Sequence, residues 1–476
     1  MRNLARAREG LTNNTGHDQA RERLARQYAE IPPGSPIRLT KRTSNLFRTR
    51  ERSSGPGLDA SGLDQVLAVD PVTRTADVQA MTTFERLVDA TLAHGLMPLV
   101  VPQLKTITIG GAVTGLGIES SSFRNGLPHE SVRELEILTG AGQIVVAGPS
   151  GKHSELFHAF PNSYGTLGYA LRVVIDLEPV HPFVHLRHVH FSSLDALADA
   201  VGHIVAASAF EGEPVDFLDG TVFAADDAYL TLGCWSDTAP YTSDYTGRQI
   251  YYQSIRSRDS DYLTVRDYLW RWDTDWFWCS RAFGAQNRVI RALWPKRWLR
   301  SDVYAKLVGW ESRHQVVARL DHLRGKPPRE RVVQDVEIPL GRTAEFLGWF
   351  LREVPIVPVW LCPLRLRGAG VQTDTQPPGE QGPWPLYPLH PDQTYVNVGF
   401  WSTVPISPGG RDGQVNRRIE KSVADHDGNK SLYSQSYYPA EEFWALYGGT
   451  TYANVKALYD PASRLLDLYA KAVGGR

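Results

Sequence analysis

The stretch TIGGAVTGLGIESSS, from Thr108 to Ser122, constrains the fold of this chain more than any other segment, because it carries four glycines and a run of hydroxyls. A Rossmann fingerprint needs G-x-G-x-x-G between a strand and a long helix, whereas Gly117 is followed by Ile-Glu-Ser. A Walker loop needs Gly-Lys-Ser/Thr, which the chain lacks. The stretch therefore predicts a turn whose backbone N–H groups and hydroxyls surround a phosphate without a helix dipole. A glycine-rich turn with no ligand is the alternative that this segment alone leaves open.

Two other segments favour the phosphate interpretation. IRLTKRTSNLFR, from Ile37 to Arg48, is a second strand-to-loop segment rich in hydrogen-bond donors. PNSYGTLGYALRVVIDLEP, from Pro161 to Pro179, leads a glycine-containing loop into a β-rich run that ends at a proline. Together the three segments resemble the FAD-binding domain of the vanillyl-alcohol oxidase/p-cresol methylhydroxylase (PCMH) family. The resemblance implies that two loops hold the pyrophosphate of FAD and that the third segment lies behind its rings.

The same resemblance implies which residues bind the cofactor. On the matching motifs they are Lys41, Thr43, Ser44, Asn45, Gln103, Thr108, Gly110, Gly111, Thr114, Gly115, Gly117, Ile118, Ser120, Ser121, His129 and Gly168. His129 is a candidate for a covalent tether, but the first loop contains neither His nor Cys, so we expect FAD to be bound non-covalently. No separate nicotinamide motif is visible, which is compatible with NADPH or NADH entering the same cleft as the reductant.

Longer segments narrow the resemblance. The GIESSS of the glycine turn, VVQDVEIPL from Val332, VPVWLCPLRLR from Val357 and SYYPAEEFWALYGG from Ser436 look like the sterol side-chain reductases that act on desmosterol. Similar actinobacterial flavoproteins reduce a methylene group on a phospholipid-bound fatty acid, as in tuberculostearic acid synthesis, and the arginine-rich composition favours that branch. The resemblance thus implies reduction of a 10-methylene fatty acyl phospholipid to the 10-methyl chain. The alternatives are a Δ24-sterol reductase or related flavin oxidase, and a peripheral lipid-binding flavoprotein without turnover.

Saturating an isolated C=C requires a proton donor beside the hydride donor, in a cavity poor in water. Four residues are candidates for this acid: Glu119, Asp335, Tyr433 and Tyr437. Glu119 follows the phosphate turn, and its alternative role is to accept hydrogen bonds from backbone N–H groups. Asp335 alternates with Glu337 along a predicted strand and so shares its face. The two tyrosines lie in the region that closes over the flavin in the wider family, with packing in the core as their alternative role.

The hydrophobic pattern predicts an α+β protein whose second half is built on an antiparallel sheet. The resemblance implies two domains, an N-terminal FAD-binding domain and a C-terminal cap or substrate domain. The expected boundaries are a disordered N-terminus at 1–16, the PCMH-type FAD-binding domain at 17–180, the cap domain at 181–425 and a C-terminal segment at 426–476 that returns to the FAD domain. Inside the FAD-binding domain, Thr82 and Glu85 predict a capping box at the start of a helix.

An insertion in the cap domain, from about Tyr262 to Trp310, interleaves tryptophans with arginines and lysines. This pattern is typical of proteins that sit on an anionic bilayer, while a cap-domain core with a solvated rim is the alternative. The expected partners are therefore the acyl chain of a phospholipid substrate and a membrane surface, and a partner methyltransferase is left open.

Composition excludes several other classes of function. The net charge of −1 gives no global attraction for nucleic acid. His185, His188 and His190 crowd one predicted strand without a Cys or carboxylate at ligand spacing, so no metal site is predicted. Three scattered cysteines indicate a reducing compartment, and no apolar run has the length of a membrane span. We therefore expect a cytoplasmic protein, peripheral on the inner face of the membrane.

Overall fold

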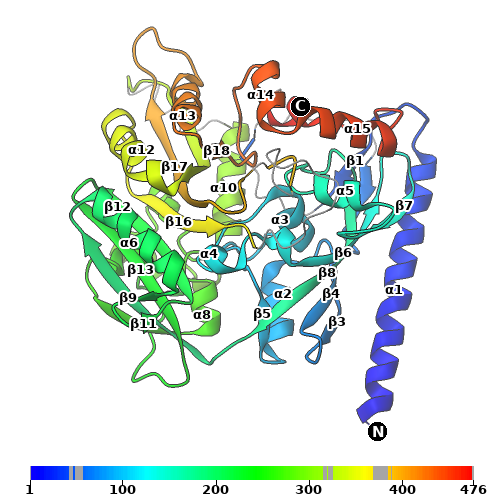
Figure 1. Ribbon diagram of the computed structural model, residues 1–476, viewed down its shortest axis with the longest axis horizontal. Helices are drawn as coiled ribbons and strands as arrows, with labels where there is room; N and C mark the ends of the chain where they lie inside the picture. Colours follow the sequence, from blue (N-terminus) through cyan, green and yellow to red (C-terminus); the bar gives the residue numbers. More distant parts are fainter. Residues whose placement is uncertain are drawn as a thin grey trace.

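The computed structural model describes residues 2–41, 47–48, 57–314, 319, 325–367, 384–387 and 389–473. Its strands form two large sheets, in which every strand pair is antiparallel, and helices cover both (Figure 1). This mixture of helices and antiparallel sheets agrees with the predicted α+β class. Among the described residues, none of the helices combines the length and the apolar character needed to cross a membrane.

The first sheet contains six strands in the order β3-β4-β8-β6-β7, with β5 paired to β8. They are β3 (Val66–Asp70), β4 (Thr75–Gln79), β5 (Leu96–Pro98), β6 (Val132–Leu138), β7 (Ile144–Ala147) and β8 (Tyr169–Pro179). β8 is the central strand, and its buried residues Val173, Ile175 and Leu177 alternate with polar neighbours, as a strand packed on one face requires. A separate parallel pair joins β1 (Arg38–Thr40) to β2 (Gly57–Asp59).

The second sheet contains eight strands in the order β14-β9-β13-β12-β16-β17-β15-β18. They are β9 (Phe183–Phe191), β12 (Phe217–Ala224), β13 (Asp227–Ser236), β14 (Ser260–Thr264), β15 (Arg329–Pro339), β16 (Val359–Arg365), β17 (Thr394–Pro405) and β18 (Asn429–Lys430). A small hairpin of β10 (Ala209–Phe210) and β11 (Glu213–Pro214) lies beside it. The chain passes from the first sheet to the second between Pro179 and Phe183, next to the expected boundary at residue 180.

The helices are mostly short. They are α1 (Arg2–Glu30), α2 (Phe84–Leu92), α3 (Ile109–Gly115), α4 (Ser122–Asn125), η1 (Pro128–Ser131), α5 (Ser154–Ala159), α6 (Leu194–Ala207), α7 (Tyr251–Ser254), α8 (Val265–Leu269), η2 (Cys279–Phe283), α9 (Arg288–Leu293), η3 (Lys296–Trp298), α10 (Ser301–His314), α12 (Leu340–Glu353), α13 (Gln414–Asp425), α14 (Ala440–Leu446), α15 (Gly449–Tyr459) and α16 (Leu468–Ala472). Helices α6 and α12 pack on the second sheet and on each other.

Two predictions about helix ends were wrong. Helix α1 begins at Arg2, so residues 2–16 of the segment expected to be disordered are helical in the structure. The reason lies in its alanine, arginine and leucine content, which has good helix propensity, and in its lack of proline. Helix α2 is capped by Thr83, whose side chain accepts from the N–H of Arg86, and not by Thr82. The hydroxyl of Thr82 instead donates to the carbonyl of Gln65, at 3.0 Å.

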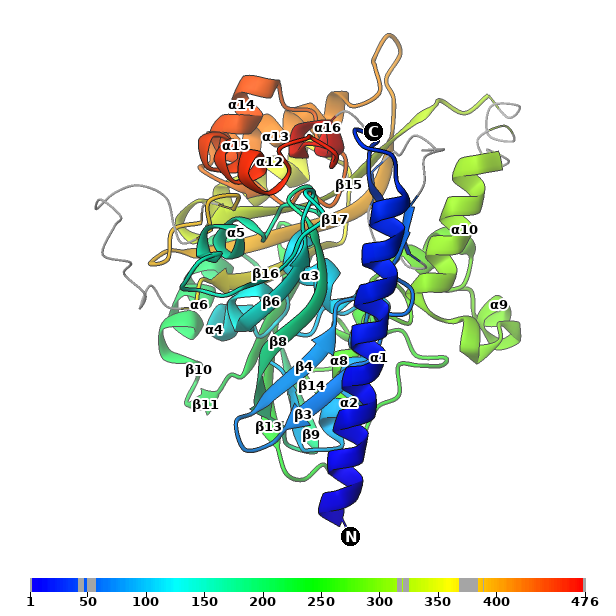
Figure 2. The same ribbon diagram turned by 90° about the vertical axis from the view of Figure 1, so that its right-hand side faces the viewer.

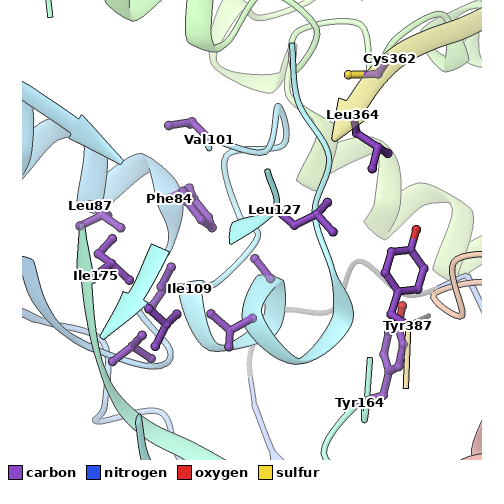
Figure 3. Packing of buried hydrophobic residues seen from close by; sticks show 14 of the residues in the cluster. Phe84, Leu87, Val101, Ile109, Leu127, Tyr164, Ile175, Cys362, Leu364 and Tyr387 are labelled. Atoms are coloured by element: carbon purple, nitrogen blue, oxygen red, sulfur yellow. The ribbon is translucent and has the colours of Figure 1, made fainter. Parts of the chain in front are cut away.

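One continuous hydrophobic cluster joins the two sheets around α3 (Figure 3). On one side Ile109 of α3 packs with Ile175 of β8 and Phe84 of α2, and on the other side the cluster reaches Cys362 and Leu364 of β16. The segment after residue 426 also contacts the first part of the chain, since the N–H of Ala141 donates to the carbonyl of Tyr459 at 2.9 Å. These contacts place α3, and the glycine turn that contains it, between the two sheets.

Candidate active site

The glycine turn begins as a short helix rather than as the pure loop that the sequence predicts. Thr108 caps α3, and its hydroxyl accepts from the N–H of Gly111 at 3.2 Å. Gly110 has to be glycine because a Cβ there would lie 2.8 Å from the carbonyl oxygen and from the Cβ of Ala80. The expectation of a phosphate turn without any helix was therefore wrong, since the small residues of GGAV let about two turns of helix pack tightly against the end of β4.

A run of backbone amides follows α3, and we call this run the nest. Leu116 follows the helix with φ 63° and ψ 158°, a region that only glycine occupies without strain. The N–H groups of Leu116, Gly117 and Ile118 donate to no acceptor among the described residues. Gly117 lies between Pro102 and Pro128, each of which would be 3.1 Å from an added Cβ. Three successive amides without protein acceptors are suited to a bound phosphate.

These amides face a cavity of about 210 Å³ between the two sheets. Its lining comes from the glycine turn, the insertion, the second sheet and the C-terminal segment. The lining residues are Lys41, Phe47, Pro102, Gln103, Leu104, Thr106, Ile107, Thr108, Gly111, Thr114, Gly115, Leu116, Gly117, Ile118, Tyr164, Trp276, Phe277, Asp335, Trp360, Trp401, Ser431 and Tyr433. This cavity is smaller than the roughly 300–1,000 Å³ of pockets that enclose a whole ligand. It therefore matches the ring portion of a ligand that is larger than the cavity.

Backbone strain is concentrated at this cavity. Leu116, Tyr164, Trp276 and Phe277 all have φ between 45° and 63°, and all four line it. Each non-glycine residue in such a conformation costs on the order of 1–3 kcal/mol, and strain of this kind gathers at ligand sites. The hydroxyl of Tyr164 donates to the carbonyl of Gly115 at 2.7 Å, which ties one strained residue to the glycine turn. The strain therefore marks the cavity as a functional site on grounds independent of its shape.

The cavity has one polar wall and one aromatic wall. The polar wall is the glycine turn together with Gln103, whose side-chain N–H₂ is buried and has no hydrogen-bond partner among the described residues. The aromatic wall stacks Phe277 on Trp401, with ring centroids 4.3 Å apart, and packs Phe277 edge-on to Trp360 at 5.4 Å. Phe47 stacks on Trp276 at 5.4 Å. A ligand here would have its phosphates at the turn and an apolar partner against the rings.

An acid lies on the aromatic side. Asp335 of β15 is half-buried, receives hydrogen bonds from Asn397 and Tyr433, and lines the cavity. Burial raises the pKa of Asp335 to about 7, although the two hydrogen bonds lower this pKa. Tyr433 in turn accepts a hydrogen bond from the indole of Trp401 at 2.9 Å. On β17, Gly399 stands opposite Asp335, and any side chain there would collide with both Asp335 and Trp401.

Glu337, two residues further along β15, is fully buried. Its carboxylate accepts from the hydroxyl of Ser431 at 2.9 Å, and burial raises the pKa of Glu337 well above its usual value. Its second oxygen has no partner among the described residues. Burial therefore favours the neutral form of the Glu337 carboxyl behind Ser431.

Glu119 is held elsewhere, in a buried network beneath the turn. Its carboxylate accepts from the backbone N–H and the hydroxyl of Ser120, both at 2.8 Å, and from Arg271 at 3.3 Å. Arg271 also donates to Asp219 at 2.9 Å and lies 4.0 Å above the ring of Tyr268. Burial raises the pKa of Glu119 to about 7 in spite of Arg271. Glu119 does not line the cavity, so the alternative role weighed for it, accepting backbone N–H groups, describes its position better.

The remaining predicted residues divide into three groups. Lys41, Gln103, Thr108, Gly111, Thr114, Gly115, Gly117, Ile118, Asp335 and Tyr433 line the cavity. Gly110, Glu119, Ser120, Ser121, His129, Gly168 and Tyr437 do not. Thr43, Ser44 and Asn45 lie outside the described residues.

Each residue of the second group has a structural partner. Ser121 donates to the carbonyl of Leu99 at 2.8 Å, and Gly168 allows close approach to β6, where a Cβ would be 2.6 Å from Ile137. The ring of His129 packs edge-on to Trp384 at 4.4 Å. Tyr437 packs against Gly413 and under Arg417.

Sequence reasoning missed the aromatic wall. Trp276 and Phe277 were in the segment read as a membrane-facing insertion, and Trp360 and Trp401 were in segments used only for the resemblance. A signal was present, because β16 and β17 place tryptophans where the strand pattern would face the core. Arg271 was missed as well, since a lone arginine among tryptophans gives no sign that it will be buried.

Comparisons with known proteins agree with this geometry. Residues 23–148 match a family described as an FAD binding domain. The chain is 25% identical to the Delta(24)-sterol reductase of Arabidopsis thaliana over 446 residues, which are 88% of this chain and 77% of that protein. It is 24% identical to the human Delta(24)-sterol reductase over 412 residues, 83% of this chain and 73% of that protein. A decaprenylphosphoryl-beta-D-ribose oxidase of Mycolicibacterium smegmatis is 32% identical over 130 residues, 27% of this chain and 28% of that protein.

The chain therefore carries an FAD-binding domain of the PCMH type, and it is an FAD-dependent oxidoreductase. Within that class it is a homologue of the Delta(24)-sterol reductases, a relationship that spans both sheets. The cavity fits the cofactor, because three successive amides and the side-chain amide of Gln103 offer donors that no described residue uses. The predicted family and the predicted FAD are thus confirmed.

Proposed function

We propose that this protein reduces an unactivated C=C in a lipid, with NADPH or NADH as the reductant, and that its substrate is the 10-methylene fatty acyl chain of a phospholipid. The observation that carries the proposal is Asp335, a carboxyl with a pKa near 7 in an aromatic wall opposite the nest. An oxidase that only removes hydride needs no such acid, whereas alkene saturation does.

The residues of the chain divide the work of the reaction between them. Bound FAD, once reduced, supplies a hydride to one alkene carbon. The Asp335 carboxyl gives its proton to the other carbon, its O–H bond breaking as the C–H bond forms, and the carboxylate is later reprotonated from water. At a pKa of about 7 close to half of Asp335 is protonated at neutral pH, which is where a general acid is most effective.

The surrounding groups prepare that step. Tyr433 donates to Asp335 and accepts from Trp401, so the carboxyl is held in one orientation. The faces of Trp401, Trp360 and Phe277 exclude water and stabilise positive charge that develops on the alkene during protonation. The amides of the nest at Leu116 to Ile118 would hold the phosphates of the cofactor, which would supply the hydride.

The test is an anaerobic single-turnover assay. Purified protein reduced by NADPH is mixed with a phospholipid that carries a 10-methylene-octadecanoyl chain, or with desmosterol, and reoxidation of the flavin and the product mass are followed. Conversion of the methylene lipid supports the proposal. Conversion of desmosterol alone supports the second candidate, a Delta(24)-sterol reductase, which is favoured by the 24–25% identity over more than four fifths of the chain. A protein that retains FAD and accepts electrons from NADPH but converts neither lipid contradicts both.

A further inference from the structure

We infer that the outer surface of the insertion is a docking site for an anionic phospholipid bilayer. The surface lies on three consecutive elements, α9, η3 and α10, which Figure 2 places together at one side of the molecule. We call it the α9–α10 patch, and it consists of Val289, Ile290, Leu293, Trp298, Leu307 and Trp310. These are six of the twelve large apolar side chains that are exposed among the described residues, gathered within 22 positions of a chain of 476.

Helix α9 has the opposite polarity to an ordinary surface helix. Its apolar residues Val289 and Leu293 are 69% and 80% exposed, while its Arg291 is only 5% exposed. A helix at the surface of a water-soluble protein normally buries the apolar stripe and exposes the charges. Val289 and Leu293 are four residues apart and therefore share one face of the helix. Exposing such an apolar face to water costs free energy, and contact with an apolar phase removes that cost.

The inward side of the insertion is fixed by buried ion pairs. Arg291 donates to both carboxylate oxygens of Asp275, at 2.7 and 2.9 Å, and to the carbonyl of Gly247 at 2.7 Å. At the start of α10, Arg300 forms a bidentate pair with Glu85 of α2, both bonds at 2.9 Å. The patch is therefore held rigidly on the FAD-binding part of the chain, so a membrane contact would set the orientation of the whole molecule.

The charge around the patch selects an anionic surface. Arg281, Arg288 and Arg297 are exposed, and none of them forms an ion pair with a described acidic residue. Asp302 is the one acidic residue between positions 281 and 310, and it is already neutralised by Arg300 and Lys306, at 3.0 and 3.1 Å. Protein–protein interfaces exclude charge from their centre, whereas arginines interspersed with exposed tryptophans and leucines are typical of membrane-surface helices. The patch therefore fits a bilayer better than a protein partner.

The patch and part of the cavity lining belong to the same segment of the chain. The same insertion supplies Trp276 and Phe277 to the aromatic wall. Behind the patch, Tyr304 stacks on Phe283 at 5.3 Å and lies 6.4 Å from Trp294. An acyl chain that leaves a bilayer at the patch would meet aromatic side chains along the insertion. This delivery role rests on the lipid substrate proposed above, whereas binding to the bilayer is measured without turnover.

The experiment is vesicle flotation of the FAD-loaded protein, with vesicles of phosphatidylcholine alone or of phosphatidylcholine mixed with phosphatidylglycerol. We expect binding to the anionic vesicles that weakens strongly as salt is raised to about 1 M. The double variant Val289→Ser with Leu293→Ser should bind at least about tenfold more weakly, because two side chains no longer enter the apolar phase. Arg288→Gln with Arg297→Gln should lose roughly fivefold per charge on anionic vesicles only.

The matched control is Val72→Ser with Leu458→Ser, which removes the same two side-chain types at exposed positions outside the insertion, 89% and 59% exposed. It should bind as the unchanged protein does. Equal binding by the α9 double variant and this control would overturn the inference, and so would no flotation of the unchanged protein at low salt. A dimer in solution that Val289→Ser with Leu293→Ser dissociates would also overturn it, since the patch would then be a protein interface. If binding fails while lipid turnover persists in detergent, only the docking site is lost.

Discussion

Two carboxyl groups in this protein, the buried Glu119 and the half-buried Asp335, have similarly raised pKa values and different surroundings. Glu119 and Asp335 both have a pKa of about 7, in each case because burial disfavours the charged form. Glu119 is held by Ser120 and Arg271 beneath the glycine turn, whereas Asp335 lines the cavity beside Tyr433. A perturbed pKa is therefore insufficient to identify an acid catalyst, and access to the reacting molecule separates the two.

The strongest test of this comparison exchanges each acid for its amide. Asp335→Asn keeps the shape of the side chain but removes the transferable proton, so the single-turnover rate of lipid reduction should fall by about 10²–10⁴-fold. Glu119→Gln should change that rate by less than about tenfold. Stopped-flow reoxidation of NADPH-reduced protein measures both. A larger loss with Glu119→Gln, at full flavin content, would reverse the roles assigned to the two residues.

The buried network around Glu119 should matter for stability rather than for chemistry. Arg271→Met leaves the carboxylates of Glu119 and Asp219 without their cation, which should lower the free energy of unfolding by about 3–5 kcal/mol. Denaturant unfolding of the FAD-loaded protein provides the value. The control is Arg266→Met, which breaks the half-exposed pair with Asp89 and should cost less than about 1 kcal/mol. Similar losses for both variants would show that the network is not a stabilising element.

The pH dependence of the single-turnover rate should report Asp335. Because the acid form is active and its pKa is about 7, the rate should be constant at lower pH and fall about tenfold per unit above pH 7. This falling part of the pH profile, the alkaline limb, should be absent from the residual rate of Asp335→Asn. A limb that persists unchanged in this variant would assign the titration to another group.

The hydroxyl of Tyr433 should set the pH at which the single-turnover rate begins to fall, that is, the position of the alkaline limb. Its hydrogen bond favours the ionised form of Asp335, so Tyr433→Phe should raise the pKa of Asp335 further and move the limb by about one unit to higher pH. Tyr437→Phe, in which the ring lies away from the cavity, is the matched control and should leave the limb in place. A shift to lower pH in Tyr433→Phe would contradict the direction of the hydrogen bond.

The smallest expected effect concerns the strained end of the glycine turn. Leu116→Ala and Leu116→Gly both remove the side chain, but only glycine relieves the strain at φ 63° and ψ 158°. Leu116→Gly should therefore be more stable than Leu116→Ala by about 1 kcal/mol, the reverse of the order found at ordinary positions. Thermal or denaturant unfolding of the pair measures the difference. Equal stability would show that the backbone relaxes when the leucine is removed.

Much of this protein is determined by local sequence. The alternation of Val173, Ile175 and Leu177 specifies β8 by itself, because a strand packed on one face must bury every second residue. The spacing of Gly115 and Gly117 predicts a phosphate turn for a local reason too, since glycine lets the backbone approach a ligand or a neighbouring side chain closely. Such segments predict the family and its cofactor because each motif contacts the ligand through its own backbone.

The tertiary structure decided what local sequence does not encode. From the sequence alone, Asp335 and Glu119 are equally good candidates for the proton donor. Only the pairing of β15 with β17 places Asp335 in the cavity, opposite Gly399. The aromatic wall brings Trp276 together with Trp360 and Trp401, each of which lies more than 80 residues further along the chain than Trp276. Likewise, Arg291 is buried and Leu293 exposed because Asp275 lies beneath α9. Burial, access and ion pairing are properties of the neighbours in space, and the sequence alone does not name those neighbours.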